Sequence, residues 1–441
     1  MVVAWIVIFA VALTVRCGAA VYWQNQQADH NAFAFGDSFS YWVLGHQLYE
    51  GNEYQFGGEN ARIARAPGFP ILIAGWHWLY SGKPSVVSVR IMNSILGAFT
   101  VLSVGWLATL LFDVRTGLFA GALSAIYPGA IAMSILILSE GPFCLFMVLE
   151  LVAIYLCFAS TQTTLITRRW AALSIGATSA VAVLIRPSWL LYTPALLTAI
   201  CLLGKNRGRQ LALSSLVLMG FVLVMSPWWI RNYQVTGRFV PTTLQVGASL
   251  YDGLRPGANG ESDMSFMQDF YRQQTQQDLD RGILSSDTYE FRLNARLRDA
   301  SLAWARENPA EVLRLAGVKL FRMWNIFPNS KEVGSGTSRL VISIGYLGIM
   351  FFTLLAVVSL IRTKRQSAIG TTQAPWRTVA LCSSPAVYFT ALHMVFVSSI
   401  RYRQPAVLVF TVLAGFGVAC CLARFSTPTC KPGQGGTHGK A

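Results

Sequence analysis

The chain has 441 residues, of which 54% are hydrophobic and 12% are charged, and its mean hydropathy is +0.47. Soluble domains carry about 25% charged residues, so this composition excludes a soluble globular protein. It predicts an all-α membrane protein with several transmembrane helices. The net charge of +15 does not indicate nucleic-acid binding, because the basic excess lies in short loops, helix ends and the tail. Membrane proteins with a basic cytoplasmic face show this distribution.

Ten apolar segments along the chain are predicted to span the bilayer. The first, "MVVAWIVIFAVALTV", lacks the basic start of a cleaved signal peptide, so we interpret it as a retained span. With the N-terminus in the cytoplasm, the basic loops "FDVRTG", "TRRW", "GKNRGRQ" and "RTKRQ" also face the cytoplasm. Residues 23–85 and 230–339 then form two outer loops. The predicted spans are residues 3–22, 86–111, 117–138, 141–159, 171–185, 188–203, 210–229, 340–361, 377–398 and 403–423.

The two outer loops are predicted to be mostly helical. In the first, "RAPGFPILIAGWHWLYSG" is apolar but too broken to span, which favours a helix lying in the membrane interface. In the second, residues 263–307 have the pattern of two amphipathic helices, and an interfacial helix is expected to begin at Pro309 with Asn308 as its cap. We expect residues 1–425 to form one domain and residues 426–441 to form a disordered cytoplasmic tail.

The cysteine and histidine patterns support neither a disulfide framework nor a metal site. All eight cysteines lie outside the two outer loops, in apolar segments, at their ends or in the tail. The spacing of the histidines fits no ligand pattern. The sequence therefore implies no cofactor, and a divalent metal is an alternative that no residue pattern supports.

Several charged residues fall at the outer level of the membrane, on segments far apart in the chain. Asp37 follows the first span, Glu140 lies between the third and fourth, and Arg186 follows the fifth. Arg401 lies between the last two spans, and Arg403 begins the last one. Arginine donates paired hydrogen bonds to phosphate, and a carboxylate beside a hydroxyl can act as a general base. Together they suit transfer from a lipid phosphate. The alternatives are arginines that snorkel at span ends and acids that merely favour helix N-termini.

These residues also belong to motifs that resemble a known family. Asp37 with Tyr41 one helical turn later, then "RAPGFP", "SEGPF", "RPSW", "SPWWIRNYQVTGRFV", "ENPAEVLRLAGVKLFRMW" and "RYRQP", together resemble integral-membrane glycosyltransferases of the GT-C superfamily. The branch that the motifs resemble most contains lipid A aminoarabinose transferases, RgtA/B/C/D-like enzymes and protein O-mannosyltransferases. The order, spacing and sidedness of the motifs carry the resemblance, which covers residues 1–425.

The resemblance implies roles for individual residues. Asp37 matches the catalytic acid of the first outer loop, and Glu140 matches the acid that follows the third span in that family. Arg65 matches the basic residue that binds the donor phosphate, and Tyr41 is assigned to substrate contact. The further donor-phosphate ligands are expected to be the arginines at the outer level: Arg186, Arg401 and Arg403.

Two departures from the family pattern concern the metal and the sugar. Ala64 stands where the aminoarabinose branch has an acid used in a metal site, and Ser40 stands in place of an arginine. Neither a metal nor aminoarabinose is therefore expected.

The resemblance implies an inverting glycosyltransferase that uses a polyprenyl-phosphate monosaccharide as its donor. The acceptor would be an envelope lipid, a glycan or a protein, and the site would face outward from a bacterial inner membrane. The alternatives are a lipid-linked sugar flippase or other transporter, and a scaffold without activity. Transporters usually contain repeated halves and place charges at mid-bilayer. This sequence contains no repeat at a fixed period, and all its candidate charges except Glu150 lie at the outer level.

Overall fold

The computed structural model describes residues 1–27, 33, 35–57, 61–80, 84–204, 206–283, 288–328, 336–363 and 375–426, so the predicted tail beyond residue 426 lies outside it. Every regular element in this part of the chain is a helix. The helices are α1 Val2–Gln26, α2 Gly36–Glu50, α3 Gly68–Leu79, α4 Val86–Leu111, α5 Val114–Ile126, α6 Pro128–Ile135, α7 Glu140–Ile154, η1 Tyr155–Ala159, α8 Leu165–Ile185, η2 Pro187–Trp189, α9 Tyr192–Leu203, α10 Arg207–Thr236, α11 Val246–Gly253, η3 Met264–Phe266, α12 Met267–Asp280, α13 Tyr289–Glu307, α14 Pro309–Trp324, α15 Gly336–Thr363, α16 Pro375–Val395 and α17 Ile400–Ser426.

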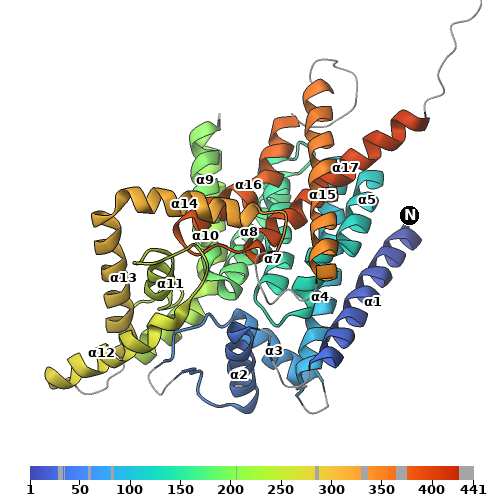
Figure 1. Cartoon of the computed structure of the whole chain (residues 1–441). Coiled ribbons are helices and arrows are strands. Elements are labelled where there is room, and N and C mark those ends of the chain that lie inside the picture. Colours follow the sequence, from blue (N-terminus) through green and yellow to red (C-terminus); the bar gives the residue numbers. More distant parts are fainter. Residues whose placement is uncertain are drawn as a thin grey trace, which may run out of the picture.

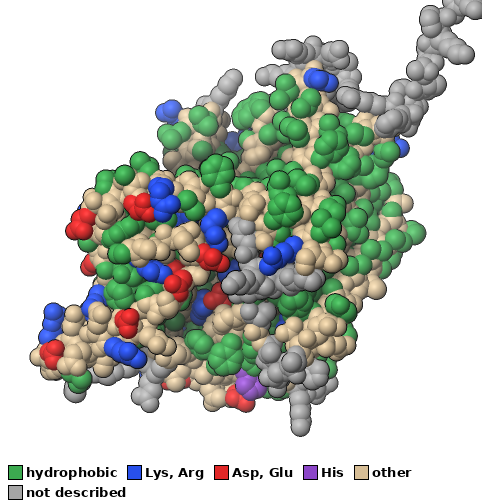
Figure 2. All heavy atoms as spheres, viewed as in Figure 1, with side chains coloured by type: hydrophobic (Ala, Val, Ile, Leu, Met, Phe, Trp, Pro, Cys, Tyr) green, Lys and Arg blue, Asp and Glu red, His purple; other side chains and the backbone are tan. Residues whose placement is uncertain are grey.

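The long apolar helices pack into one bundle, and α11, α12 and α13 form a lobe beside it (Figure 1). Helices α2 and α3 lie at one end of the bundle, next to this lobe. On the face drawn in Figure 2, hydrophobic side chains cover much of the bundle and charged side chains gather over the lobe. This contrast is expected if the bundle meets lipid and the lobe meets water.

Seven helices among the described residues are long and apolar enough to cross a membrane, or eight if the bent pair α5 and α6 counts as one span. The predicted fold class, an all-α protein with many spans, is confirmed, and the protein is an integral multi-pass membrane protein. The predicted number of ten spans is approximate. The segments predicted at 171–185 and 188–203 form α8 and the short α9, which do not meet the same criteria.

The third predicted span, residues 117–138, is bent rather than straight. Helices α5 and α6 meet at an angle of 55°, and Pro128 begins α6. Proline has no backbone N–H to continue the hydrogen bonding of a preceding helix, so a new helix begins there. The bend leaves carbonyl groups at the end of α5 without partners inside the helix.

Two buried arginines hold the carbonyls that this bent span leaves free. Arg16 of α1 donates to the carbonyls of Ser124 and Ala125, at 3.0 and 2.9 Å, at the end of α5. Arg90 of α4 donates to the carbonyl of Ile135, the last residue of α6. A cation at a helix C-terminus also interacts favourably with the helix dipole. Arg16 therefore stabilises the bend itself, and Arg90 stabilises the far end of α6, from which the chain leads to α7.

The helices predicted in the second outer loop are present as α12, α13 and α14, and α14 begins at Pro309 as expected. Asn308 is the N-cap residue of α14 as predicted, but its side chain makes no cap hydrogen bond there and instead donates to the carbonyl of Trp304 in α13, at 2.9 Å. A proline at the first helical position lacks one of the N–H groups that need a cap. Leu313 and Phe321 remain exposed on α14, as suits a helix in the membrane interface.

Candidate active site

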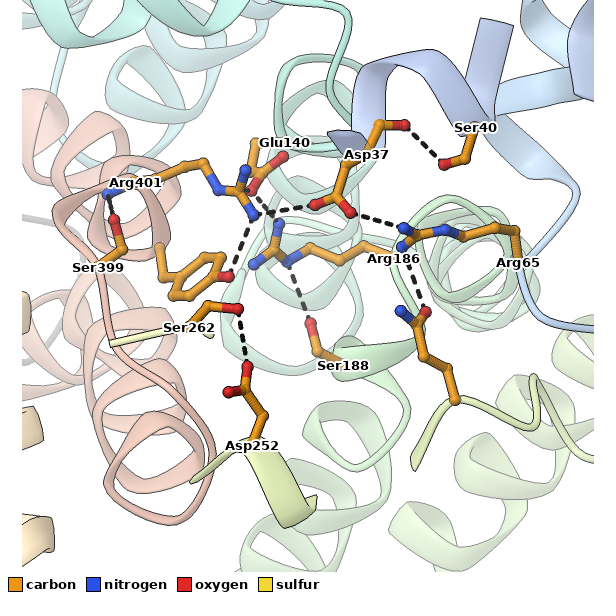
Figure 3. A network of polar contacts seen from close by, with 12 residues as sticks. Asp37, Ser40, Arg65, Glu140, Arg186, Ser188, Asp252, Ser262, Ser399 and Arg401 are labelled. Atoms are coloured by element: carbon orange, nitrogen blue, oxygen red, sulfur yellow. Dashed lines mark hydrogen bonds and ion pairs between the residues drawn. The ribbon is translucent and has the colours of Figure 1, made fainter. Parts of the chain in front are cut away.

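Five charged side chains from five different segments form a continuous chain of ion pairs (Figure 3). Arg65 lies 2.6 Å from Asp37, and Asp37 lies 3.3 Å from Arg401 through its other carboxylate oxygen. Arg401 lies 3.0 Å from Glu140, and Glu140 lies 2.8 Å from Arg186. The structure thus brings together five of the seven predicted site residues, which the sequence separates by up to 364 positions.

Both acids lie where a helix begins. Asp37 is in the first turn of α2, and Glu140 is the first residue of α7. A carboxylate at a helix N-terminus is stabilised by the helix dipole. Glu140 is also fixed by the segment before it, because Arg90 and Asn93 of α4 donate to the carbonyls of residues 135–136. These contacts at the end of α6 therefore help to set the position of the second acid.

Arg186 is placed by a helix end and by a close backbone contact. It follows the last residue of α8, where Pro187 prevents the helix from continuing. Gly68, at the start of α3, packs directly on the chain just before it. A Cβ atom at Gly68 would lie 2.6 Å from the carbonyl carbon of Leu184 and 2.7 Å from the amide nitrogen of Ile185. Because glycine has no Cβ atom, the segment that carries Arg65 can approach the segment that carries Arg186.

We expect Gly68→Ala to lower the free energy of unfolding by about 1–3 kcal/mol, the usual cost of overpacking, because α3 and α8 must separate. Thermal unfolding of the purified protein would measure the effect. Gly75→Ala is the matched control, since a Cβ at Gly75 in the same helix meets nothing within 4 Å. Equal behaviour of the two variants would show that the close contact at Gly68 is not required.

Three polar partners of the arginines were not predicted, and the first is Ser188, whose hydroxyl accepts from Arg186 Nε at 3.1 Å (Figure 3). Gln245, just before α11, accepts a hydrogen bond from Arg65 at 3.2 Å. The hydroxyl of Tyr402 accepts one from Arg401 at 3.1 Å. Gln245 stands in no motif, and only the position of Tyr402 between two predicted arginines could have drawn attention to it.

The last two predicted residues have different surroundings. Tyr41 lines the same cavity as the ion pairs, and its ring centre lies 5.3 Å from the guanidinium carbon of Arg65. Arg403 is fully buried and points elsewhere: its Nη1 donates to the carbonyls of Met323 and Asn325, at the end of α14. Arg403 therefore fastens α14 to α17 and does not join the ion-pair chain.

The charges of the site do not cancel. The ion-pair chain contains three arginines and two carboxylates, so it has one positive charge in excess when all five are ionised. Burial alone would raise the pKa of Asp37, but the charges of Arg65 and Arg401 outweigh it and hold this pKa below its ordinary value. An excess charge that is largely removed from water favours binding of a counter-ion. The part of the cavity where these three arginines meet is therefore suited to an anion.

The ion pairs line a cavity of about 1610 Å³. One part of its wall comes from membrane helices and includes Trp23 and Met133, and another comes from the lobe and includes Ser249, Tyr271 and Asn294. Small-molecule sites typically have volumes of about 300–1,000 Å³, so this cavity has room for more than one substrate group.

The lack of a metal requirement stays a prediction. In the described parts of the chain, no three His, Cys, Asp or Glu side chains are grouped in a way that could hold a metal ion. Ala64 beside Arg65 has no ligand atom to offer in its side chain.

Comparisons with known proteins agree on the fold. Residues 69–240 match the family model of dolichyl-phosphate-mannose-protein mannosyltransferase. Among solved structures, the chain is similar to the archaeal oligosaccharyltransferase AglB from Archaeoglobus fulgidus in complex with an inhibitory peptide and a dolichol-phosphate. The TM-score is 0.60 at 12% identity, and the match covers 95% of this chain and 50% of that one. The chain has a GT-C fold.

Two further solved structures are similar to the chain. The apo form of the Archaeoglobus oligosaccharyltransferase has a TM-score of 0.57 at 13% identity, over 96% of this chain and 51% of that one. ArnT from Cupriavidus metallidurans bound to undecaprenyl phosphate has a TM-score of 0.45 at 16% identity, over 95% and 78%. No curated protein gives a match. The GT-C fold confirms the resemblance predicted from the motifs, and the chain spans about half the length of the oligosaccharyltransferase.

Proposed function

We propose that this protein is an inverting glycosyltransferase that moves a monosaccharide from a polyprenyl-phosphate donor to a hydroxyl group of an acceptor. The observation that carries the proposal is the ion-pair chain with one excess positive charge, in a cavity between membrane helices and the lobe. A sugar ester of a polyprenyl phosphate has one negative charge, which matches that excess. The mannosyltransferase family model and the dolichol-phosphate in the AglB complex support this donor class.

The donor phosphate binds among Arg65, Arg186 and Arg401. These three guanidinium groups converge from the turn after α8, from α17 and from the loop before α3, and each can offer paired hydrogen bonds to phosphate oxygens. The apolar wall that includes Trp23 and Met133 accommodates the start of the lipid chain. The sugar then lies next to Asp37.

Donor binding also prepares Asp37 for catalysis. Both of its carboxylate oxygens accept from arginines, Oδ1 from Arg65 and Oδ2 from Arg401. A phosphate placed between these guanidinium groups gives them another anionic partner, so it loosens their hold on the carboxylate. Asp37 then becomes free to accept a hydrogen bond from the acceptor hydroxyl, and its pKa moves toward the ordinary value.

The chemical step is a single displacement. The acceptor oxygen forms a bond to the anomeric carbon, the bond between that carbon and the phosphate oxygen breaks, and the hydroxyl proton passes to Asp37. The leaving phosphate gains one negative charge as the carboxylate loses one. The total negative charge next to the arginines therefore stays the same, but more of it lies on the phosphate. Stabilisation of this developing phosphate charge by the arginines accelerates the transfer.

The substrate details are proposals of the same kind. The sugar is a hexose or a pentose, and the acceptor is an envelope lipid, a glycan or a protein with access to the lobe. The reaction takes place on the outer face of a bacterial cell membrane and needs no metal. Glu140 stabilises the arrangement of Arg186 and Arg401, the two arginines to which it is paired.

Radiolabelled polyprenyl-phosphate sugars test the proposed function directly. The purified protein, incubated with the labelled donor and an envelope extract, should release polyprenyl phosphate and move the label to a new acceptor. The same mixture with heat-denatured protein is the control. A flippase would move the intact donor across a vesicle membrane and leave the sugar on its lipid, so label that stays lipid-linked with every sugar tested would contradict the transferase.

A further inference from the structure

The loop that carries Arg65 is fixed by groups from distant parts of the chain. The hydroxyl of Tyr54 donates to the carbonyls of Arg65 and Ala66, at 3.1 and 3.2 Å. Arg231, near the end of α10, donates to the carbonyl of Arg62 at 2.8 Å. Outside a helix, a backbone segment has a defined position only when such partners hold it. The direction of the Arg65 side chain therefore depends on these contacts.

Glu290 of α13 holds the same loop from the lobe. Its Oε2 accepts from the backbone N–H groups of Arg62 and Ile63, at 2.9 and 3.1 Å, and its Oε1 lies 3.3 Å from the Ile63 nitrogen. The Glu290 side chain lines the cavity but is 9% exposed, so water cannot readily replace it as the acceptor. Charge-assisted hydrogen bonds of this kind are stronger than neutral ones. Glu290 thus holds the backbone of Arg62 and Ile63, three and two positions before Arg65.

A second side chain of α13 holds the other loop that reaches Arg65. Asn294, one helical turn after Glu290, accepts from the backbone N–H of Gly247 at 2.7 Å. Gln245, two residues earlier, accepts a hydrogen bond from the Arg65 guanidinium. One face of α13 therefore anchors both segments that meet at this arginine.

We propose that Glu290 is a positioning residue that fixes the guanidinium of Arg65 for the donor phosphate by holding the backbone of residues 62–63. The consequence for substrate rests on the proposed function, whereas the anchoring of the loop does not. The proposal makes the lobe part of the donor site, although Glu290 and Arg62 are 228 positions apart in the sequence.

Hydrogen–deuterium exchange of the full-length protein tests the anchoring without any substrate. In Glu290→Ala, the amides of a peptide covering residues 61–66 should exchange about tenfold faster, because two protected N–H groups lose their acceptor. Glu290→Gln keeps an acceptor oxygen that can reach both groups, so its exchange should stay close to that of the wild type. Glu311→Ala, which removes an exposed acid of α14 paired with Arg314, is the matched control and should leave this peptide unchanged. Unchanged exchange in Glu290→Ala would overturn the proposal.

Binding of undecaprenyl phosphate tests whether the anchoring acts through Arg65. Glu290→Ala should weaken binding of this lipid about tenfold, and Glu290→Gln should restore most of it. In an Arg65→Ala background, Glu290→Ala should have no further effect, because the group that it positions is gone. Equal weakening in both backgrounds would show a general structural role and overturn the proposal.

The two measurements separate this role from the proposed function. If the wild-type protein protects the 61–66 amides through Glu290 but does not bind undecaprenyl phosphate, the donor class is wrong and the anchoring stands. If the lipid binds and Glu290→Ala changes neither exchange nor affinity, the donor class stands and the positioning role is wrong.

Discussion

Asp37→Asn is expected to lower the rate of sugar transfer by about 10²–10⁴-fold, the range of general-base catalysis, while undecaprenyl phosphate binds at least as tightly as to the wild type. An amide cannot take the proton of the acceptor hydroxyl. It also has no charge to hold Arg65 and Arg401, which lie 2.6 and 3.3 Å from the carboxylate oxygens. The excess charge of the site rises from one to two, so an anionic lipid should bind more strongly.

Transfer from labelled donor and binding of the lipid product would measure the two expected changes. Glu50→Gln is a suitable control, because Glu50 ends the same helix and its carboxylate pairs with His46 on the surface instead of the cavity. Full transfer by a folded Asp37→Asn protein would exclude Asp37 as the base. Weaker lipid binding in this variant would contradict the competition between the carboxylate and the phosphate for the same arginines.

Much of the fold could be predicted because hydrophobic segments of span length leave few alternatives. The bend in the third span was missed although Pro128 was visible. Whether a proline bends a span depends on partners for the freed carbonyls, and here the partner is Arg16, which comes from α1. The N-cap position at Asn308 was predicted correctly, but the partner of its side chain was not, since the same amide can serve the end of one helix or the start of the next.

The candidate site could be predicted in part, from the side of the membrane on which each loop lies and from the order of the motifs. These placed Asp37, Glu140 and the arginines at one membrane level, and the GT-C resemblance added Arg65. They could not separate Arg401 from Arg403, which stand two residues apart on α17. Two positions correspond to about 200° of helix rotation, so one side chain faces the cavity and the other faces α14. Glu290 was missed because nothing in its sequence context indicates a partner in the first outer loop.

Arg401→Gln is expected to weaken binding of undecaprenyl phosphate by at least about 100-fold and to reduce transfer in proportion, since it removes a charge-assisted pair from a buried site. Arg401 is bonded to both acids, Asp37 Oδ2 at 3.3 Å and Glu140 Oε1 at 3.0 Å. Its loss cancels the excess positive charge and leaves the carboxylates to repel an anion.

The geometry of Arg401 should matter as well as its charge. Its Nη2 reaches Asp37 and its Nε reaches Glu140, so one planar group bridges the two acids. Arg401→Lys keeps the positive charge but not the planar, forked guanidinium group. Its affinity for undecaprenyl phosphate should therefore lie between those of the wild type and Arg401→Gln, about tenfold below that of the wild type. Arg377→Gln, at an exposed arginine near the start of α16, should bind as the wild type does. Lipid binding by Arg401→Gln that equals the control would mean that the anion site lies elsewhere in the cavity, and the proposed phosphate position would have to be abandoned.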